Sequence, residues 1–359
     1  MRRKLPEQVL LQEVNRQVAE LCRNRDGLKL MEVCGTHTMA ISSSGIRRAV
    51  DPRLKLVSGP GCPVCVTEES DIDRAIGFAA LKGVTVLTFG DMMRVPGTNG
   101  SLNDARAKGA DVRVVYSPLD GLQMARQESE REFVFLGVGF ETTAPTVAAT
   151  VLEAEKLQVK NFSVLPLFKL IPPALKFIAA RAQIRIDGLI LPGHVSTVIG
   201  AQPYRFLVDR YRIPCCITGF EPRDILEGIF LLLQQIVKGP ELTIQYRRSV
   251  RPEGNPQAKA LMATVFKLVD ANWRGIGKIA RSGLGFKRRF ARFDARQRFG
   301  VVAGKKSKRT GCACGDVMLG LKTPPECRLF ARRCTPESPI GPCMVSSEGA
   351  CAAYYRYER

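Results

Sequence analysis

Residues 28–38 read LKLMEVCGTHT, a short apolar run that ends in a loop carrying Cys34 and His37. The same order of apolar run, polar loop and helical stretch returns along the chain as far as about residue 246. Strands are expected at 28–33, 54–58, 84–89, 111–116, 133–138, 162–167, 188–191 and 214–218, and helices at 5–21, 70–81, 144–157, 173–182, 203–211 and 221–237. Because strands alternate with helices, we predict an α/β fold with parallel sheets covered on both faces.

Eight strands could form one large sheet or two smaller ones, and we favour two, with a hinge near 145–160. A short internal repeat gives weak support for two sheets. Gly-Phe-Glu occurs at 139–141 and again at 219–221, each time between an apolar run and a helical stretch. We expect a first α/β domain at 1–145 that includes an N-terminal helix, and a second at 146–246. A third domain at 247–359 would contain one helix (257–270), a basic segment and a loop-rich, cysteine-rich tail.

The composition bounds the class of protein. The chain has 359 residues, 45% of them hydrophobic, which is enough for ordinary globular cores. No apolar run approaches the roughly 18 residues of a membrane span, and the charged N-terminus lacks the apolar region of a secretory signal. We therefore expect a cytoplasmic protein with no membrane contact, in which clustered cysteines serve metal or redox chemistry.

The formal net charge is +20, and much of the excess lies at 281–309, where phenylalanines interleave with Lys and Arg. Such a segment could bind nucleic acid through phosphate pairing and base stacking. It could also be a partly helical connector whose phenylalanines pack inward. No recognised nucleic-acid motif accompanies the charge, so we expect no nucleic-acid partner and favour an acidic protein partner.

The most reactive residue types follow the strands, where open α/β sheets bind ligands. Cys34 falls at a strand-to-helix junction, where backbone N–H groups and the helix dipole are expected to lower its pKa. His37 is close enough to act as a charge partner or base. The alternative is a small buried cysteine beside a capping histidine.

A Cys-x-x-Cys pair, Cys62 and Cys65, follows the next strand within GPGCPVC (59–65). A zinc ribbon would need a second such pair, which the sequence lacks. The pair is therefore interpreted as a redox dithiol, or as part of a site that Cys34 completes.

Two further loops carry candidate site residues. GVGFETT (137–143) lacks the third glycine of a dinucleotide loop, so Glu141 is expected either to contact a ligand or to cap the next helix. His194, the second of only two histidines, also follows a strand. Asp91 is a further candidate in the same layer, whereas Cys215 and Cys216 lie on a strand and are expected to be core residues.

Half of the twelve cysteines lie in the tail, at 312, 314, 327, 334, 343 and 351. Four thiolates can hold an iron–sulfur cluster, and the remaining two can form a reactive dithiol beside it. Spacing alone does not decide which four are ligands.

Taken in order, these loops resemble those of the hydrogenase maturation factor HypD family. The resemblance rests on MEVCGTHT (31–38), GPGCPVC (59–65), GFETT (139–143), LPGHVSTVIG (191–200), GFEP (219–222) and the tail motif at 312–355, and it covers essentially the whole chain. It implies two α/β domains with parallel sheets and a C-terminal iron–sulfur domain. It also implies a role in assembling the Fe(CN)2CO unit of [NiFe] hydrogenases with a HypC-type chaperone and a HypE-type cyanide donor.

The resemblance also implies residue roles. Cys34 would be the iron ligand for Fe(CN)2CO, a transient cargo, and Cys62 and Cys65 the redox dithiol near it, with His194 a functional histidine. Cys312, Cys327, Cys334 and Cys351 would hold a [4Fe-4S] cluster, and Cys314 and Cys343 would form the adjacent dithiol.

On this hypothesis Glu141, His37 and His194 supply protons or hydrogen bonds, and the protein is a redox-active scaffold more than a turnover enzyme. Three other classes remain open. They are a stand-alone iron–sulfur thiol–disulfide reductase, a nucleic-acid-binding iron–sulfur protein, and a cysteine hydrolase built on Cys34 and His37.

Overall fold

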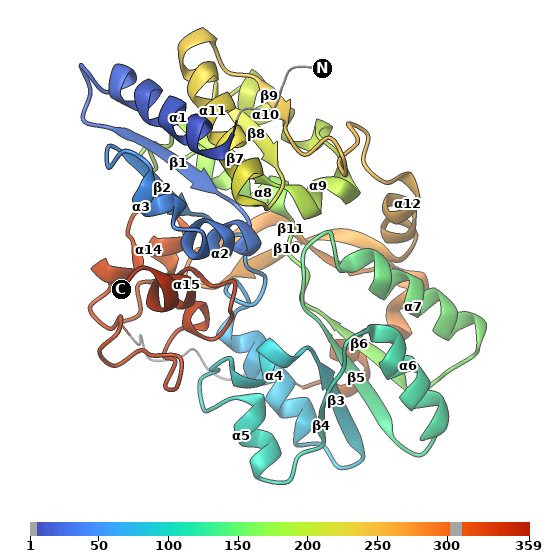
Figure 1. The fold of residues 1–359 in the computed structure, drawn as a ribbon. Coiled ribbons are helices and arrows are strands. Elements are labelled where there is room, and N and C mark those ends of the chain that lie inside the picture. The colour runs from blue at the N-terminus through green and yellow to red at the C-terminus, as the bar shows by residue number, and fades with distance from the viewer. Residues whose placement is uncertain (1–5, 302–310) are drawn as a thin grey trace.

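The computed structural model describes residues 6–301 and 311–359, and it contains two parallel sheets (Figure 1). The first, sheet A, has the order β2-β1-β7-β8-β9, from β1 (Leu28–Glu32), β2 (Leu54–Ser58), β7 (Gly188–Pro192), β8 (Cys215–Thr218) and β9 (Leu242–Ile244). The second, sheet B, has the order β4-β3-β5-β6, from β3 (Val84–Thr88), β4 (Val112–Val114), β5 (Glu132–Gly137) and β6 (Phe162–Pro166). The predicted fold class is confirmed, and among the strands of these two sheets the short edge strand β9 is the one that was not predicted.

Helices cover both faces of each sheet, as the apolar character of the strands requires. They are α1 (Glu7–Leu21), α2 (Gly35–Ser43), α3 (Ile46–Ala49), α4 (Glu69–Ala79), η1 (Gly90–Arg94), α5 (Leu102–Ala107), α6 (Pro118–Gln127), α7 (Ala144–Lys156), α8 (Ile171–Ala179), α9 (Gly193–Ile199), η2 (Gln202–Tyr204), α10 (Arg205–Asp209) and α11 (Pro222–Lys238). Successive strand residues point to opposite faces. Leu30 therefore packs in the core beneath α1 and α11, while Met31 enters the core on the other face.

The pairing of the strands does not follow chain order. Strands β1 and β2 lie in sheet A beside β7 and β8, although all of sheet B stands between them in the sequence. The predicted division at residue 145 does not separate the sheets, since residues 1–145 and 146–246 each contribute strands to both. An apolar pattern indicates that a strand is buried but does not specify which strands lie beside it. The neighbours of β1 are known only from the structure, in which β1 pairs with β2 and β7.

A two-stranded antiparallel hairpin, β10 (Phe266–Trp273) and β11 (Gly277–Phe286), follows α12 (Pro256–Val265). The predicted helix at 257–270 is therefore wrong beyond Val265. Pairing along β11 overrides the helical pattern, and it buries Phe266 and Trp273 at the two ends of the strand.

The basic segment continues as η3 (Arg288–Phe293) and α13 (Ala295–Phe299). Phe286, Phe290 and Phe293 are buried against sheet B, as the connector interpretation expects. Arg289 and Arg298 pair with Glu155 and Glu132 at distances of 3.0 and 2.5 Å. Residues 302–309 of the basic run lie outside the described residues.

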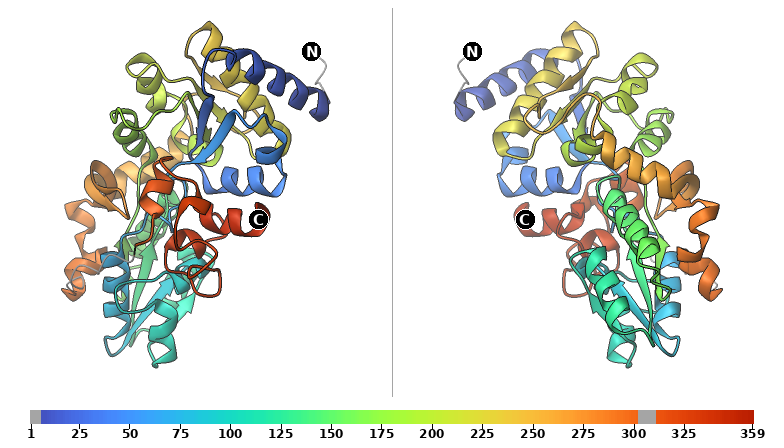
Figure 2. Two further views of the ribbon diagram at one scale, coloured as in Figure 1. Left: turned by 90° about the vertical axis from the view of Figure 1, so that its left-hand side faces the viewer. Right: turned by 90° about the vertical axis from the view of Figure 1, so that its right-hand side faces the viewer.

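The C-terminal tail is mostly loop, with α14 (Cys314–Met318), η4 (Pro324–Glu326), η5 (Pro342–Met344) and α15 (Ala350–Tyr357). The tail is red in Figure 2 and lies against α2 at the junction between the two sheets. Within the described ranges, no helix has the length and apolar character needed to cross a membrane.

Candidate functional site

Four candidate loops meet at one edge of sheet A because β2, β1, β7 and β8 are neighbours whose carboxyl ends point the same way. Cys34 is the residue before α2, and the Gly35 N–H donates to the Gly61 carbonyl oxygen at 3.0 Å. A Cβ built on Gly61 would come within 2.3 Å of the Cys34 nitrogen. Only glycine at 61 therefore lets the Cys-x-x-Cys loop pack directly against Cys34.

Cys62 and Cys65 are joined by a disulfide, and their Cα atoms are 5.2 Å apart. Both are buried, with 5% and 2% of their surface exposed. The Cys65 N–H also points at the Cys62 sulfur, at 3.2 Å. The pair therefore lies enclosed in a loop that packs against Cys34.

Cys34 carries a free thiol and is 8% exposed. Burial raises its pKa to about 12, and the nearby Glu348 carboxylate adds to this rise. The expectation of a lowered pKa is therefore wrong. The Thr36 hydroxyl and the N–H groups of Thr36 and His37 do favour the thiolate, but the cost of removing a charge from water is larger.

The two histidines lie on opposite sides of one aromatic ring. The Phe220 ring stacks on His37, with centroids 4.6 Å apart, and on His194, with centroids 3.9 Å apart. His37 is fully buried, and its Nε2 lies 2.9 Å from both the Gly219 carbonyl oxygen and the Thr218 hydroxyl. Burial lowers the His37 pKa to about 4, so this ring is neutral at physiological pH. Partial loss of hydration lowers the His194 pKa, and Glu348 acts in the opposite direction. The rest of the His194 side chain is exposed.

Glu348 brings the C-terminal tail to Cys34. The Thr36 hydroxyl donates to Glu348 Oε1 at 2.8 Å, and a Cβ on Gly35 would come within 2.5 Å of the Glu348 Cβ. The same turn is attached to sheet B, because the Ser346 hydroxyl donates to Asp91 Oδ2 at 2.8 Å. Asp91, a predicted candidate, thus positions the tail.

Glu141 belongs to a different part of the site, after β5 of sheet B. Its Oε1 accepts the N–H of Ile171 at 3.0 Å, while its buried Oε2 has no partner among the described residues. Burial raises the Glu141 pKa to about 8, so the carboxyl carries a proton at neutral pH. Glu141 thus accepts a hydrogen bond from the first residue of α8, and its second oxygen is buried without a partner among the described residues.

All six tail cysteines line one small cavity, together with apolar side chains such as Val317, Phe330 and Met344. Burial raises the pKa of Cys343 and of Cys351, and neighbouring cysteines add to both shifts. Contact with Cys314 raises the pKa of Cys312. This donor set, all sulfur in an apolar shell, fits an iron–sulfur cluster. Among the described residues, however, no three His, Cys, Asp or Glu side chains are already placed to hold a metal ion.

The tip of the β10–β11 hairpin connects this cavity to the Cys-x-x-Cys loop. The Arg274 N–H donates to the Val66 carbonyl oxygen at 3.0 Å, and the Arg274 guanidinium pairs with Glu69 at 2.7 Å. Gly275 packs against Gly315, whose added Cβ would meet the Gly275 oxygen at 2.1 Å. The buried Arg274 charge favours the thiolate forms of Cys312 and Cys343.

Sequence reasoning missed Phe220, Glu348 and Arg274 as site residues. Phe220 lies in GFEP (219–222) and Glu348 in the tail motif (312–355), so position in a family motif is the signal that identifies them. Arg274 had no signal, because its role depends on a hairpin that was predicted in part as a helix. Cys215 and Cys216 are fully buried on β8, as expected of core residues.

Comparison with known proteins gives concordant matches over nearly the whole chain. The HypD family model, described as "Hydrogenase formation hypA family", matches residues 9–358. A hydrogenase maturation factor HypD of Cupriavidus necator is 43% identical over 359 residues, covering 98% of this chain and 95% of that protein. A HypD of Rhizobium leguminosarum bv. viciae is 42% identical, covering 98% and 93%. A putative hydrogenase expression/formation protein of Methanocaldococcus jannaschii is 38% identical and covers 98% of each chain.

Proposed function

Because the chain belongs to the HypD family of hydrogenase maturation factors, we propose that it is the redox-active scaffold on which Fe(CN)2CO is assembled. The observation that carries this proposal is the direct packing of the Cys62–Cys65 loop against Cys34 through Gly61. A single thiol beside a reversible disulfide, enclosed at a strand edge, can hold a metal cargo and change its redox state.

Cys34 is the proposed iron ligand. A single soft sulfur donor suits an iron centre that also carries CO and cyanide, and it leaves positions for a cysteine of a partner. The thiol must lose its proton when iron binds, because its pKa is raised to about 12. Glu348 and the Thr36 hydroxyl are the polar side chains that act on this thiol, and Glu348 also acts electrostatically on His194.

The neighbouring disulfide supplies redox capacity. Reduction of the Cys62–Cys65 bond takes up two electrons and two protons and gives two thiols. His37 is neutral and donates or accepts one hydrogen bond at a time from Nε2, so we assign it to orienting the Thr218–Phe220 loop. Glu141, protonated at neutral pH, offers a hydrogen-bond donor on the sheet B side.

We further propose that Cys312, Cys327, Cys334 and Cys351 hold a [4Fe-4S] cluster, with Cys314 and Cys343 as a second dithiol. A cluster bound there supplies single electrons. The proposal is supported by the shared cavity of the six sulfurs and by its contact with the hairpin tip. The proposed partners are a HypC-type chaperone and a HypE-type cyanide donor, and the proposed location is the cytoplasm.

Infrared spectroscopy tests the proposal. The protein would be co-purified anaerobically with a HypC-type partner, and the cyanide and carbonyl stretching region would be recorded. We expect bands that vanish in Cys34→Ala and remain in Cys22→Ala, a matched change of a buried cysteine at the end of α1. Bands that persist in Cys34→Ala would remove Cys34 as the ligand.

A second candidate function is a stand-alone thiol–disulfide reductase, and the disulfide between Cys62 and Cys65 favours it. This candidate predicts reduction of a generic protein disulfide without any chaperone. The reductase candidate would be supported if a preparation reduces a generic protein disulfide and shows iron–sulfur absorbance, yet lacks the cyanide and carbonyl bands.

A further inference from the structure

A large groove lies between α8 and α10 on one side and α12 with the β10–β11 hairpin on the other. Its volume is about 1520 Å³. Sites for small ligands commonly measure roughly 300–1,000 Å³. The groove is therefore large enough for a segment of polypeptide.

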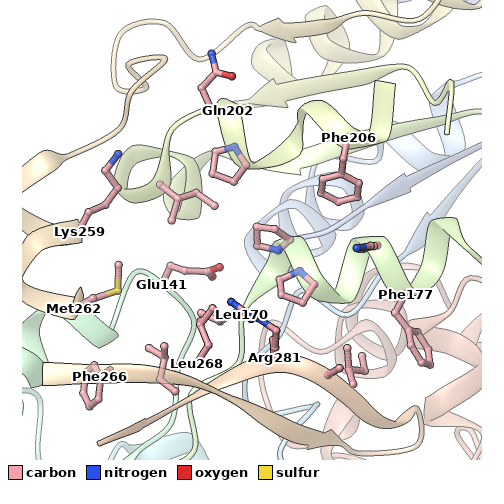
Figure 3. Close-up of a pocket in the computed structure, with 18 of the residues that line it drawn as sticks. Glu141, Leu170, Phe177, Gln202, Phe206, Lys259, Met262, Phe266, Leu268 and Arg281 are labelled. Carbon is pink, nitrogen blue, oxygen red and sulfur yellow. The ribbon is translucent and has the colours of Figure 1, made fainter. Parts of the chain in front are cut away.

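The walls of the groove are apolar. Leu268 on β10 is 48% exposed, although a leucine on a strand is usually covered. Figure 3 shows Leu268 and Phe266 along one wall, Met262 of α12 at one end, and Phe206 and Phe177 on the opposite side. An exposed apolar surface of this kind favours a partner with apolar side chains of its own.

The groove also carries positive charge that this chain does not neutralise. Seven lining cations form no ion pair with a carboxylate of the described residues, although ion pairs are common elsewhere in the structure. They are Lys176, Arg181, Arg210, Lys259, Lys267, Arg281 and Lys287. The carboxylates that line the groove are Glu253 and the buried Glu141.

Glu141 gives the groove a polar point at its base. Its side chain is 3% exposed, its Oε2 has no partner among the described residues, and Figure 3 shows it pointing into the groove. Its other oxygen, Oε1, accepts the Ile171 N–H at 3.0 Å, so Glu141 adds no counter-charge that is accessible to the cations of the groove.

We propose that this groove binds an acidic, amphipathic polypeptide segment of a partner protein. The apolar side chains of the segment lie against Leu268, Phe206 and Phe177, and its carboxylates pair with the cations around them. The inference does not depend on the proposed iron chemistry, because peptide binding is measured without metal.

The charge of the chain argues against other occupants. A second copy carries the same net charge of +20 and is repelled. The segments 1–5 and 302–310 of this chain are themselves basic, with three and four Lys or Arg residues. Nucleic acid would match the cations but would leave the apolar walls without a partner.

Fluorescence anisotropy tests the proposal with a fluorescein-labelled peptide, EELLEELLEELLEELL, on the full chain. We expect saturable binding that Leu268→Asp weakens about tenfold, because a buried carboxylate replaces an apolar contact. The control Leu119→Asp changes another exposed leucine, 43% exposed on α6, and should leave binding within about twofold of the parent. The double variant K176E/R281E should also weaken binding about tenfold, and R126E/K238E, outside the groove, should not.

Three results would overturn the proposal. The first is equal weakening by groove and control variants, which would mean general attraction to a basic surface. The second is tight binding of labelled oligo-dT that the groove variants abolish, which would assign the groove to nucleic acid. The third is the absence of saturable peptide binding to the parent protein at low ionic strength. Unchanged melting temperatures would show that the variants, all at exposed or half-buried positions, remain folded.

Discussion

Cys34, His37 and Glu141 are all buried, which their residue types alone do not predict. Each is at most 8% exposed, and in each the neutral form is favoured at physiological pH. The cause is the same for all three, because a charge in a low-dielectric interior loses its hydration. These three side chains are therefore neutral, with Glu348 beside Cys34, and under the proposed function Cys34 would release its proton when iron binds.

Removing the charge of Glu348 should make Cys34 more reactive. Glu348→Gln keeps the size of the side chain but removes the anion that disfavours the thiolate, so alkylation of Cys34 by iodoacetamide at pH 8 should quicken about two- to fivefold. Peptide mass spectrometry follows the rate at Cys34 alone. Glu337→Gln, a change of an exposed glutamate in the same tail, is the control and should leave the rate unchanged.

Glu141 should make folding stability depend on pH. Its pKa is about 8 in the folded chain and about 4.5 when unfolded, so the unfolded chain releases its proton first. Stability from this group is complete below pH 4.5 and is lost as the pH rises through about 8, by up to a few kcal/mol. Glu141→Gln should remove this loss, so its melting temperature relative to the parent should be higher at pH 8.5 than at pH 5. An equal difference at both pH values, as expected for the exposed control Glu130→Gln, would contradict the assignment.

At the scale of the secondary-structure elements, three glycines allow segments of the site to pack closely against one another. The loop after β2 meets the start of α2 at Gly61, α2 meets the tail at Gly35, and the hairpin tip meets α14 at Gly315. In each contact an added Cβ would come within 2.5 Å of a backbone or Cβ atom. The site is thus assembled by close backbone contacts between segments that are far apart in sequence.

Gly61→Ala should separate the Cys-x-x-Cys loop from Cys34. The methyl group would meet the Cys34 nitrogen and Cα at 2.3 and 2.5 Å, so the loop must shift, at a cost of about 1–3 kcal/mol. Thermal unfolding measures the loss. Gly90→Ala is the control, since the added Cβ would lie 3.9 Å from its nearest neighbour, a methyl carbon of Val114. This variant should have the same melting temperature as the parent. Equal melting temperatures for both variants would refute the tight contact.

For the whole molecule, the hairpin and the tail connect the two sheets around the site. Arg274 pairs with Glu69 of α4 and donates to the Pro96 carbonyl oxygen at 2.9 Å, while Asp91 binds the tail through Ser346. The tail reaches α2 of the sheet A layer through Glu348. The tail that carries the six cysteines therefore contacts elements that follow strands of both sheet A and sheet B. These contacts help to hold the two sheets in their relative positions.

Arg274→Met should weaken this connection. It leaves Glu69 without its partner and removes a buried guanidinium, which should cost about 2–4 kcal/mol. Limited proteolysis should then cut the hairpin faster, and the melting temperature should fall. Lys278→Met breaks an exposed pair with Asp270 on the same hairpin and should have little effect. If the two variants behave alike, Arg274 does not connect the layers.

Local sequence patterns identify eight of the strands and the loops that follow them. Apolar runs of strand length mark what must be buried, and the motifs after them place Cys34, Cys62, Cys65 and His194 at strand ends. Both are local properties, readable within about ten residues. The resemblance to HypD proteins rests on the same loops, and the family match confirms it.

Which of these residues meet, and which of them are neutral, depends on the packing of the whole fold. Pairing of β1 with β7 joins positions separated by more than 150 residues, and it brings Cys34 beside the Phe220 and His194 loops. The expected fall in the Cys34 pKa became a rise because helix position is local, whereas burial depends on everything packed around the thiol. Desolvation and strand pairing both depend on residues that are far apart in sequence, so neither can be predicted from a single short stretch.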